Sequence, residues 1–225
     1  LQIALIGMAQ DFVGANNINL FKPNGQFGTR LQGGKDHASP RYIFTLLSQL
    51  TWLIYRMEDL PILKYKKSEG MTIEPDYYIP IVPMVMINGA EGIGTGFSTN
   101  VPNHNPSDII KICKQLSKEI DKAMKEEDVV TESDIRKAWE AIHDAKLSNI
   151  NPWYLGYKGD ISLTKDGVFA SRGVYKWIDD TTVEITELPI GIWTNDYKEF
   201  LTSMITNNSD VLKDFESGYT TKTVK

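Results

Sequence analysis

The sequence predicts an α+β fold, because it combines helix-like and strand-like patterns in separate segments. Several segments place apolar residues at helical spacing. Three later segments, Gly159–Leu163, Phe169–Trp177 and Thr182–Leu188, are rich in β-branched and aromatic residues and predict strands. The composition also changes sharply in the middle of the chain. We therefore expect two domains, over residues 1–86 and 87–225.

The N-terminal segment begins apolar and reaches a Gly-Ala-Asn-Asn turn at residues 14–17, which predicts a helix followed by a short strand over Ile18–Phe21. Pro23-Asn24-Gly25 is a strong turn signal. Residues 28–40 are rich in glycine, polar and charged residues and show no apolar period. A loop of this length inside a compact domain is usually functional or disordered.

Ser39 and Pro40 supply a cap and a first-turn proline, so we expect a helix to begin there. Tyr42 would lie in its first turn, where the helix dipole favours an anion. The apolar face of this helix would consist of five residues at helical spacing: Ile43, Leu46, Leu47, Leu50 and Leu53.

The middle of the chain is rich in loop signals. Pro61, Gly70 and Pro75 indicate a loop-rich connection, and residues 74–86 form an extended segment studded with aromatic residues and prolines. This segment leads into a glycine-rich loop over residues 88–96.

The remaining helices carry their own start signals. Asn105 is expected to cap a helix with one apolar stripe, and Thr131 with Asp134 resembles a variant capping box for the next helix. A short last helix should begin at Thr194 or Asn195.

Composition bounds the class of protein. The chain has 225 residues, of which 41% are hydrophobic, so it can bury a core. Cys113 is the single cysteine, so no disulfide can form within the chain, and its helical position favours plain core packing. The longest apolar stretch, residues 79–87, is interrupted by two prolines and predicts no membrane helix. We expect an internal piece of a longer protein from a reducing compartment, without a signal peptide.

The formal net charge of -5 hides an asymmetry. Acidic residues concentrate between residues 118 and 134. The segment 21–42 instead holds four cations and one anion: Lys22, Arg30, Lys35 and Arg41 against Asp36. We interpret Asp36 as a local loop charge. An acidic average is therefore compatible with a local basic face.

Common nucleotide and metal motifs fail on spacing. The residues after Gly33 do not complete a Walker A loop, and Phe97 stands where a dinucleotide fingerprint needs glycine. The three histidines, His37, His104 and His143, fall in unrelated segments, so the ligands for a zinc site are too few.

Residues 28–42 combine a flexible backbone with three cations and the phenol of Tyr42. Arginine, lysine and backbone N–H groups hold phosphates without reading base sequence. A tyrosine with a pKa of about 10 needs an adjacent cation, metal or base to attack phosphorus, and Arg41 is the adjacent cation. On the residues alone, an ordinary surface tyrosine among solvated cations remains the favoured alternative.

Several long motifs stand in register along the chain: Met8–Asn17, Gly25–Lys35, Ala38–Phe44, Asn88–Gly96 and Glu184–Ile190 followed by Trp193-Thr194. Together they resemble the breakage and rejoining core of eukaryotic-type type IIA DNA topoisomerases. The resemblance covers the whole chain apart from about residues 114–150.

This resemblance implies a partial winged-helix domain followed by a tower domain. It implies an ATP-dependent homodimer that opens a transient double-strand break in DNA and passes a second duplex through it. Tyr42 would form a 5′-phosphotyrosyl bond, and Arg41 would stabilise the transition state. Mg²⁺ and ATP would be bound by TOPRIM and ATPase regions outside this chain, so we expect the chain alone to be inactive. The implied location is the nucleus or, for a viral protein, the host nucleus or a cytoplasmic viral factory.

The resemblance also implies DNA contacts. Ile93 would be a wedge inserted between base pairs to kink the duplex. Trp193 would contact DNA, with a hydrophobic anchor as an equally favoured alternative. Lys35, Arg30 and Gln32 would contact the DNA backbone.

Three features depart from the family pattern. Phe97 stands where tryptophan is common, and Gly191 where a basic residue often precedes the tryptophan motif. The acidic helical segment over residues 118–145 is longer than usual. These departures suggest a divergent eukaryotic or large-DNA-virus branch.

Two rival functions remain open. One is an architectural module that bends DNA with Ile93 but performs no cleavage. The other is an ordinary globular domain with a phosphate-accommodating loop. A covalent DNA adduct on Tyr42 would distinguish cleavage from both.

Overall fold

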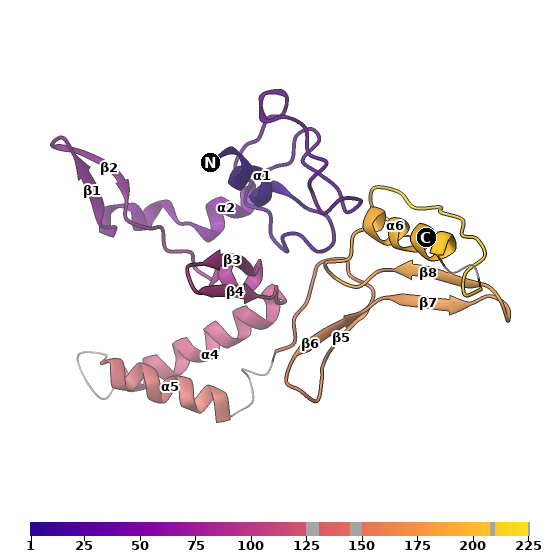
Figure 1. Cartoon of the computed structure of the whole chain (residues 1–225). Coiled ribbons are helices and arrows are strands. Elements are labelled where there is room, and N and C mark those ends of the chain that lie inside the picture. The colour runs from indigo at the N-terminus through magenta and orange to yellow at the C-terminus, as the bar shows by residue number, and fades with distance from the viewer. Residues whose placement is uncertain (125–130, 145–149, 208–209, 225) are drawn as a thin grey trace. The chain divides into compact units, whose positions relative to one another are not determined.

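The computed structural model describes residues 1–124, 131–144, 150–207 and 210–224 (Figure 1). The chain forms two compact units: unit 1 comprises Leu1–Leu46 with Asn151–Lys225, and unit 2 comprises Leu47–Ile150. Both units contain helices and antiparallel strand pairs, which confirms the mixed helix and strand class. This division of contacts does not coincide with the expected boundary at residue 86, which stays a prediction, as does the winged-helix and tower arrangement.

Unit 1 is built around a small core at the start of the chain. Its regular elements are α1 (Gln2–Ala9), the 3-10 turn η1 (Pro40–Tyr42), β5 (Asp160–Leu163), β6 (Phe169–Arg172), β7 (Val174–Trp177), β8 (Val183–Glu187) and α6 (Thr194–Asn207). Ile6 and Ala9 of α1 are buried with Phe27, and Phe21 and Ile43 pack against them. The core therefore anchors the chain on both sides of the long loop over residues 28–40.

The strands of unit 1 form two antiparallel pairs, β5 with β6 and β7 with β8. The single strand predicted over 169–177 is therefore divided in two. The break lies at Gly173, where an added Cβ would lie only 2.2 Å from the carbonyl oxygen of Glu187. This close backbone approach ends one pair and begins the next.

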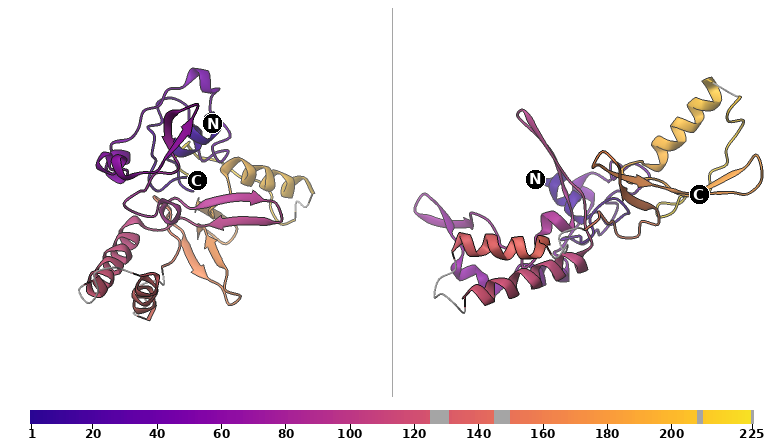
Figure 2. Two further views of the ribbon diagram at one scale, coloured as in Figure 1. Left: turned by 90° about the vertical axis from the view of Figure 1, so that its left-hand side faces the viewer. Right: turned by 90° about the horizontal axis from the view of Figure 1, so that it is seen from below.

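Unit 2 contains α2 (Gln49–Ile54), the 3-10 segment η2 (Met57–Ile62), β1 (Tyr65–Ser68), β2 (Met71–Pro75), α3 (Met84–Ile87), β3 (Ala90–Gly94), β4 (Phe97–Val101), α4 (Pro106–Met124) and α5 (Glu132–Asp144). The helices α4 and α5 lie side by side (Figure 2). Both predicted caps are confirmed. The Asn105 side chain accepts the Ser107 N–H at 2.9 Å, and the Asp134 carboxylate accepts the Thr131 hydroxyl at 2.6 Å.

Two sequence predictions in unit 1 are wrong. No strand forms over residues 18–21, because the Leu20 N–H donates to the Met8 carbonyl at 3.0 Å instead of to a neighbouring strand. No continuous helix follows Pro40 either. The Lys22 N–H donates to the Leu46 carbonyl at 2.8 Å, and Phe44 pairs with Asn24, so the chain after Tyr42 runs extended.

Two hairpins occupy segments that the sequence analysis treated as loops. β1 pairs with β2 across Glu69 and Gly70, which adopt φ angles of 51° and 80°. β3 pairs with β4 in unbroken register, with Ile93 opposite Ser98. Glycine-rich composition hid this second hairpin, because β3 offers few residues with a preference for strands.

Among the described residues, no helix combines the length and apolarity that crossing a membrane requires.

Candidate nucleic-acid interface

The site is organised by residues 28–35, which we call the glycine loop. It begins directly after the buried Phe27 and folds back on itself, since an added Cβ at Gly28 would lie 2.6 Å from Cα of Gly34. Gly28 adopts a φ of 101°, which L side chains rarely tolerate. The Gln10 side chain donates to the carbonyls of Phe27 at 2.9 Å and Gly34 at 3.2 Å. The loop is therefore a defined structure.

Asp36 closes the glycine loop. Its carboxylate accepts the Thr29 N–H at 2.8 Å and the Thr29 hydroxyl at 2.6 Å. The Thr29 carbonyl in turn accepts the Gly34 N–H at 2.9 Å. Asp36 thus acts as a local loop charge, as the sequence predicts.

Tyr42 ends the 3-10 turn η1, and its side chain is 69% exposed. The Tyr42 N–H donates to the Ser39 carbonyl at 2.9 Å, and the next residue, Ile43, packs against the core. The expected helix dipole is absent, because η1 has three residues and Ile43 is already extended. The local cation is Arg41, whose guanidinium carbon lies 5.1 Å from the centre of the Tyr42 ring. An exposed phenol beside a fixed cation is suited to meeting a phosphate.

Arg30 occupies a different environment from the other loop cations. It is 4% exposed, forms an ion pair with Glu187 and donates to the Leu188 carbonyl at 3.1 Å. In this conformation its charge is used inside the protein. The placement does not favour the expected contact between Arg30 and a DNA phosphate.

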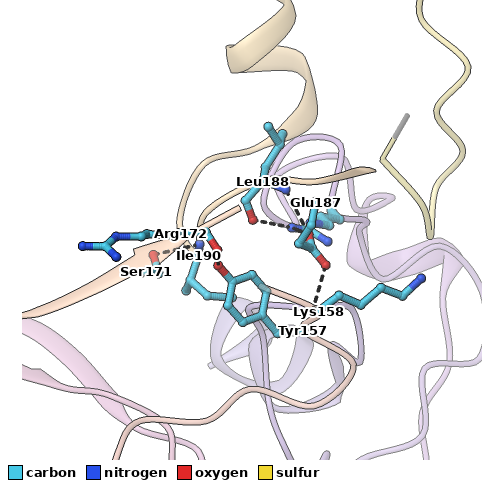
Figure 3. A network of polar contacts seen from close by, with 8 residues as sticks. Tyr157, Lys158, Ser171, Arg172, Glu187, Leu188 and Ile190 are labelled. Carbon is cyan, nitrogen blue, oxygen red and sulfur yellow. Dashed lines mark hydrogen bonds and ion pairs between the residues drawn. The ribbon is translucent and has the colours of Figure 1, made fainter. Parts of the chain in front are cut away.

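Glu187 is the centre of the polar network around Arg30 (Figure 3). Its carboxylate also accepts the N–H groups of Leu188 at 3.0 Å and Lys158 at 3.2 Å. The neighbouring Tyr157 hydroxyl donates to the Arg172 carbonyl at 2.6 Å. Burial, and then the negative charge of Glu187, raises the pKa of Tyr157 above its usual value, so this phenol stays protonated.

Trp193 packs against the glycine loop. An added Cβ at Gly33 would lie 2.3 Å from Cε2 of Trp193, and the Phe12 ring meets Trp193 edge-on at a centroid distance of 5.9 Å. The indole is half-buried. This placement favours the anchoring alternative for Trp193, although its predicted DNA contact is untested.

The other predicted contacts lie on the surface. Lys35 and Gln32 are exposed on the glycine loop of unit 1. Ile93, in unit 2, is 97% exposed on the β3–β4 hairpin, and Phe97 beside it is 84% exposed. An apolar side chain this exposed contributes nothing to the core of its own unit.

The fit of Mg²⁺ and ATP can be tested on the donor groups present. In the described ranges, no three His, Cys, Asp or Glu side chains gather where they could hold a metal ion. Asp36 is committed to Thr29. The sequence also lacks a Walker A loop. The described residues therefore do not fit either group, and no step below passes through them.

Sequence reasoning missed Glu187 and Gln10 as loop-holding residues. Both lie within or beside motifs of the family resemblance, which was the one signal that pointed to them. Neither periodicity nor charge pattern indicates that Glu187 pairs with Arg30, since the partners are far apart in the chain.

Comparison with known proteins gives consistent relatives. The family model for the A protein of DNA gyrase/topoisomerase IV matches residues 1–225. DNA topoisomerase 2 of Arabidopsis thaliana is 45% identical over 212 residues, covering 92% of this chain and 13% of the relative. DNA topoisomerase 2 of Drosophila melanogaster is 43% identical over 219 residues, covering 97% of this chain and 13% of the relative.

A solved structure shows the same fold. The Plasmodium falciparum topoisomerase II DNA-binding, cleavage and re-ligation domain matches with a TM-score of 0.79 and 40% identity. The match covers 99% of this chain and 27% of that one. The chain thus spans a small part of the proteins it resembles.

Proposed function

Because this chain belongs to the DNA gyrase/topoisomerase IV family, we propose that it is the segment of a type IIA DNA topoisomerase that carries the attacking tyrosine. The observation that carries this proposal is the exposed Tyr42 held beside Arg41 on a turn anchored by Ile43. The names of the relatives support the reaction class, since they are DNA topoisomerases 2.

The reaction is an in-line displacement at phosphorus. The Tyr42 oxygen forms a bond to the phosphorus while the bond from phosphorus to the 3′-oxygen breaks. The phenol proton is lost and the leaving 3′-oxygen takes up a proton, so protein remains on the 5′ end. Arg41 donates hydrogen bonds to the non-bridging oxygens, where charge builds in the transition state. Rejoining reverses these steps.

The proposal extends to the parent enzyme. One Tyr42 cuts one strand, so a double-strand break requires two copies, which a symmetric homodimer supplies. ATP hydrolysis, the metal-binding TOPRIM carboxylates and the exit gate belong to other regions of the polypeptide. Passage of a second duplex and a nuclear location are likewise proposed from the family.

The test is Tyr42→Phe in the full-length enzyme. This change removes the attacking oxygen and leaves the ring, so we expect loss of the covalent DNA adduct with DNA affinity nearly unchanged. Tyr175→Phe is the matched control, because Tyr175 is 67% exposed in the same unit. An adduct that persists in Tyr42→Phe would overturn the assignment of the nucleophile.

A second role is supported by Ile93 and Phe97. Their exposure on a narrow hairpin suits insertion between base pairs, which kinks DNA. We propose that this bending accompanies cleavage. Bending without any adduct on Tyr42 would instead favour the architectural alternative.

A further inference from the structure

We propose that residues 187–195, which we call the clamp segment, position the glycine loop for DNA binding and cleavage. The clamp segment runs from the end of β8 to the start of α6. The inference rests on the proposed function, because it assigns a purpose to the loop that carries Lys35 and leads to Tyr42. It makes Glu187 and Trp193 positioning residues, which act through the loop without touching DNA.

The first contact is the buried ion pair between Glu187 and Arg30. The side chains are 3% and 5% exposed, so the charges are shielded from water. Arg30 also donates to the Leu188 carbonyl of the clamp segment at 3.1 Å. A guanidinium with two acceptors on one segment fixes the start of the loop in orientation as well as in distance.

The second contact is a wall formed by Trp193. Gly33 lies so close to the indole that an added Cβ would overlap it at 2.3 Å. Phe12 meets the indole edge-on, which limits its movement. Glycine is required at this position for a second reason, because φ is 61°.

The third contact joins the two backbones. The Asn195 N–H at the start of α6 donates to the Leu31 carbonyl at 3.0 Å. The clamp segment therefore holds the loop at Arg30, Leu31 and Gly33, three points around its turn. Gln32 lies between these points and Lys35 just beyond them, and both are exposed.

The consequence is preorganisation. A free loop would lose conformational entropy when phosphates bind, whereas a clamped loop has lost it on folding. Correct placement also affects rate, because an error of about 1 Å at a reacting group costs about 100-fold. We therefore expect the clamp segment to control cleavage although its key side chains face the protein.

The experiment compares Trp193→Leu and Glu187→Gln with matched controls in the full-length enzyme. The controls are Trp177→Leu, at a 60% exposed tryptophan of unit 1, and Glu199→Gln, at an exposed position of α6. Amide exchange across residues 28–36 is measured without DNA. Single-turnover formation of the covalent adduct is measured with DNA.

Both clamp variants should exchange their loop amides about tenfold faster and form the adduct about tenfold more slowly, with the controls unchanged. Exchange in the absence of DNA separates positioning from direct contact, because loss of a DNA contact alone would not change it. Slower adduct formation with unaltered loop exchange would overturn the inference. Faster loop exchange with normal adduct formation would also overturn it.

A second variant guards against misfolding. Gly33→Ala should slow adduct formation in the wild-type background and slow it less in Trp193→Leu, because a shorter side chain removes the 2.3 Å overlap. An equal penalty in both backgrounds would show that Trp193 does not position the loop. A persistent adduct in Tyr42→Phe would instead overturn the proposed function, so the two failures are distinguishable.

Discussion

Removing Glu187 should destabilise unit 1 more than removing Arg30, although the two form one ion pair. The perturbations are Glu187→Met and Arg30→Met, which retain apolar bulk and remove one charge each. Breaking a buried pair from one side costs about 3 to 5 kcal/mol, because an uncompensated charge remains inside. Both side chains are at most 5% exposed, so solvent does little to reduce this cost.

The asymmetry follows from the partners that remain. After Arg30→Met, the carboxylate of Glu187 keeps the N–H groups of Leu188 and Lys158 at 3.0 and 3.2 Å. After Glu187→Met, Arg30 keeps the Leu188 carbonyl, while both N–H groups lose their carboxylate acceptor. Two lost hydrogen bonds at about 1 kcal/mol each make the expected difference about 2 kcal/mol.

The assay is native-state amide exchange in the full-length protein, read at strand β8 and at residues 157–158. A difference of about 2 kcal/mol corresponds to about 30-fold faster opening in Glu187→Met than in Arg30→Met. The double variant should cost less than the sum of the single variants, because it leaves no buried charge. Equal opening in the single variants, or strict additivity in the double variant, would refute the reasoning.

Three further outcomes are expected. Arg41→Ala should slow single-turnover cleavage about 100- to 1,000-fold, as for loss of one transition-state donor, and an unchanged rate would remove Arg41 from the mechanism. Ile93→Ala should reduce the DNA bend measured by energy transfer between end labels, whereas an equal bend would end its role as a wedge. Hydrogen bonds from the Thr131 hydroxyl, and then from its N–H, hold the pKa of Asp134 below its usual 3.8. Its support of the α5 N-terminus is therefore complete above about 3.8 and lost as pH falls through the lower folded pKa. Amide exchange at that terminus should show this transition, and Asp134→Asn should abolish it.

Helices with local start signals could be predicted from the sequence. The caps at Asn105 and Thr131 form as expected, and α6 begins at Thr194. The helix expected after Pro40 fails because its apolar spacing competes with a tertiary alternative. Backbone pairing of Phe44 with Asn24 holds that segment extended, and no local pattern encodes the partner.

The site divides in the same way. The exposed Tyr42 and Lys35 lie on the cationic segment that the charge pattern indicates. The burial of Arg30 could not be predicted, because one arginine looks like another until its partner is placed. Glu187 reaches Arg30 only when the chain returns to unit 1 after passing through unit 2.

The most direct measurement is to trap the full-length enzyme on supercoiled DNA with denaturant, digest it and identify the peptide linked to DNA. We predict a single linked peptide joined through the Tyr42 oxygen to the 5′ end of each cut strand. A linkage to another residue, a linkage to 3′ ends, or cleaved DNA without any attached peptide would contradict the central claim.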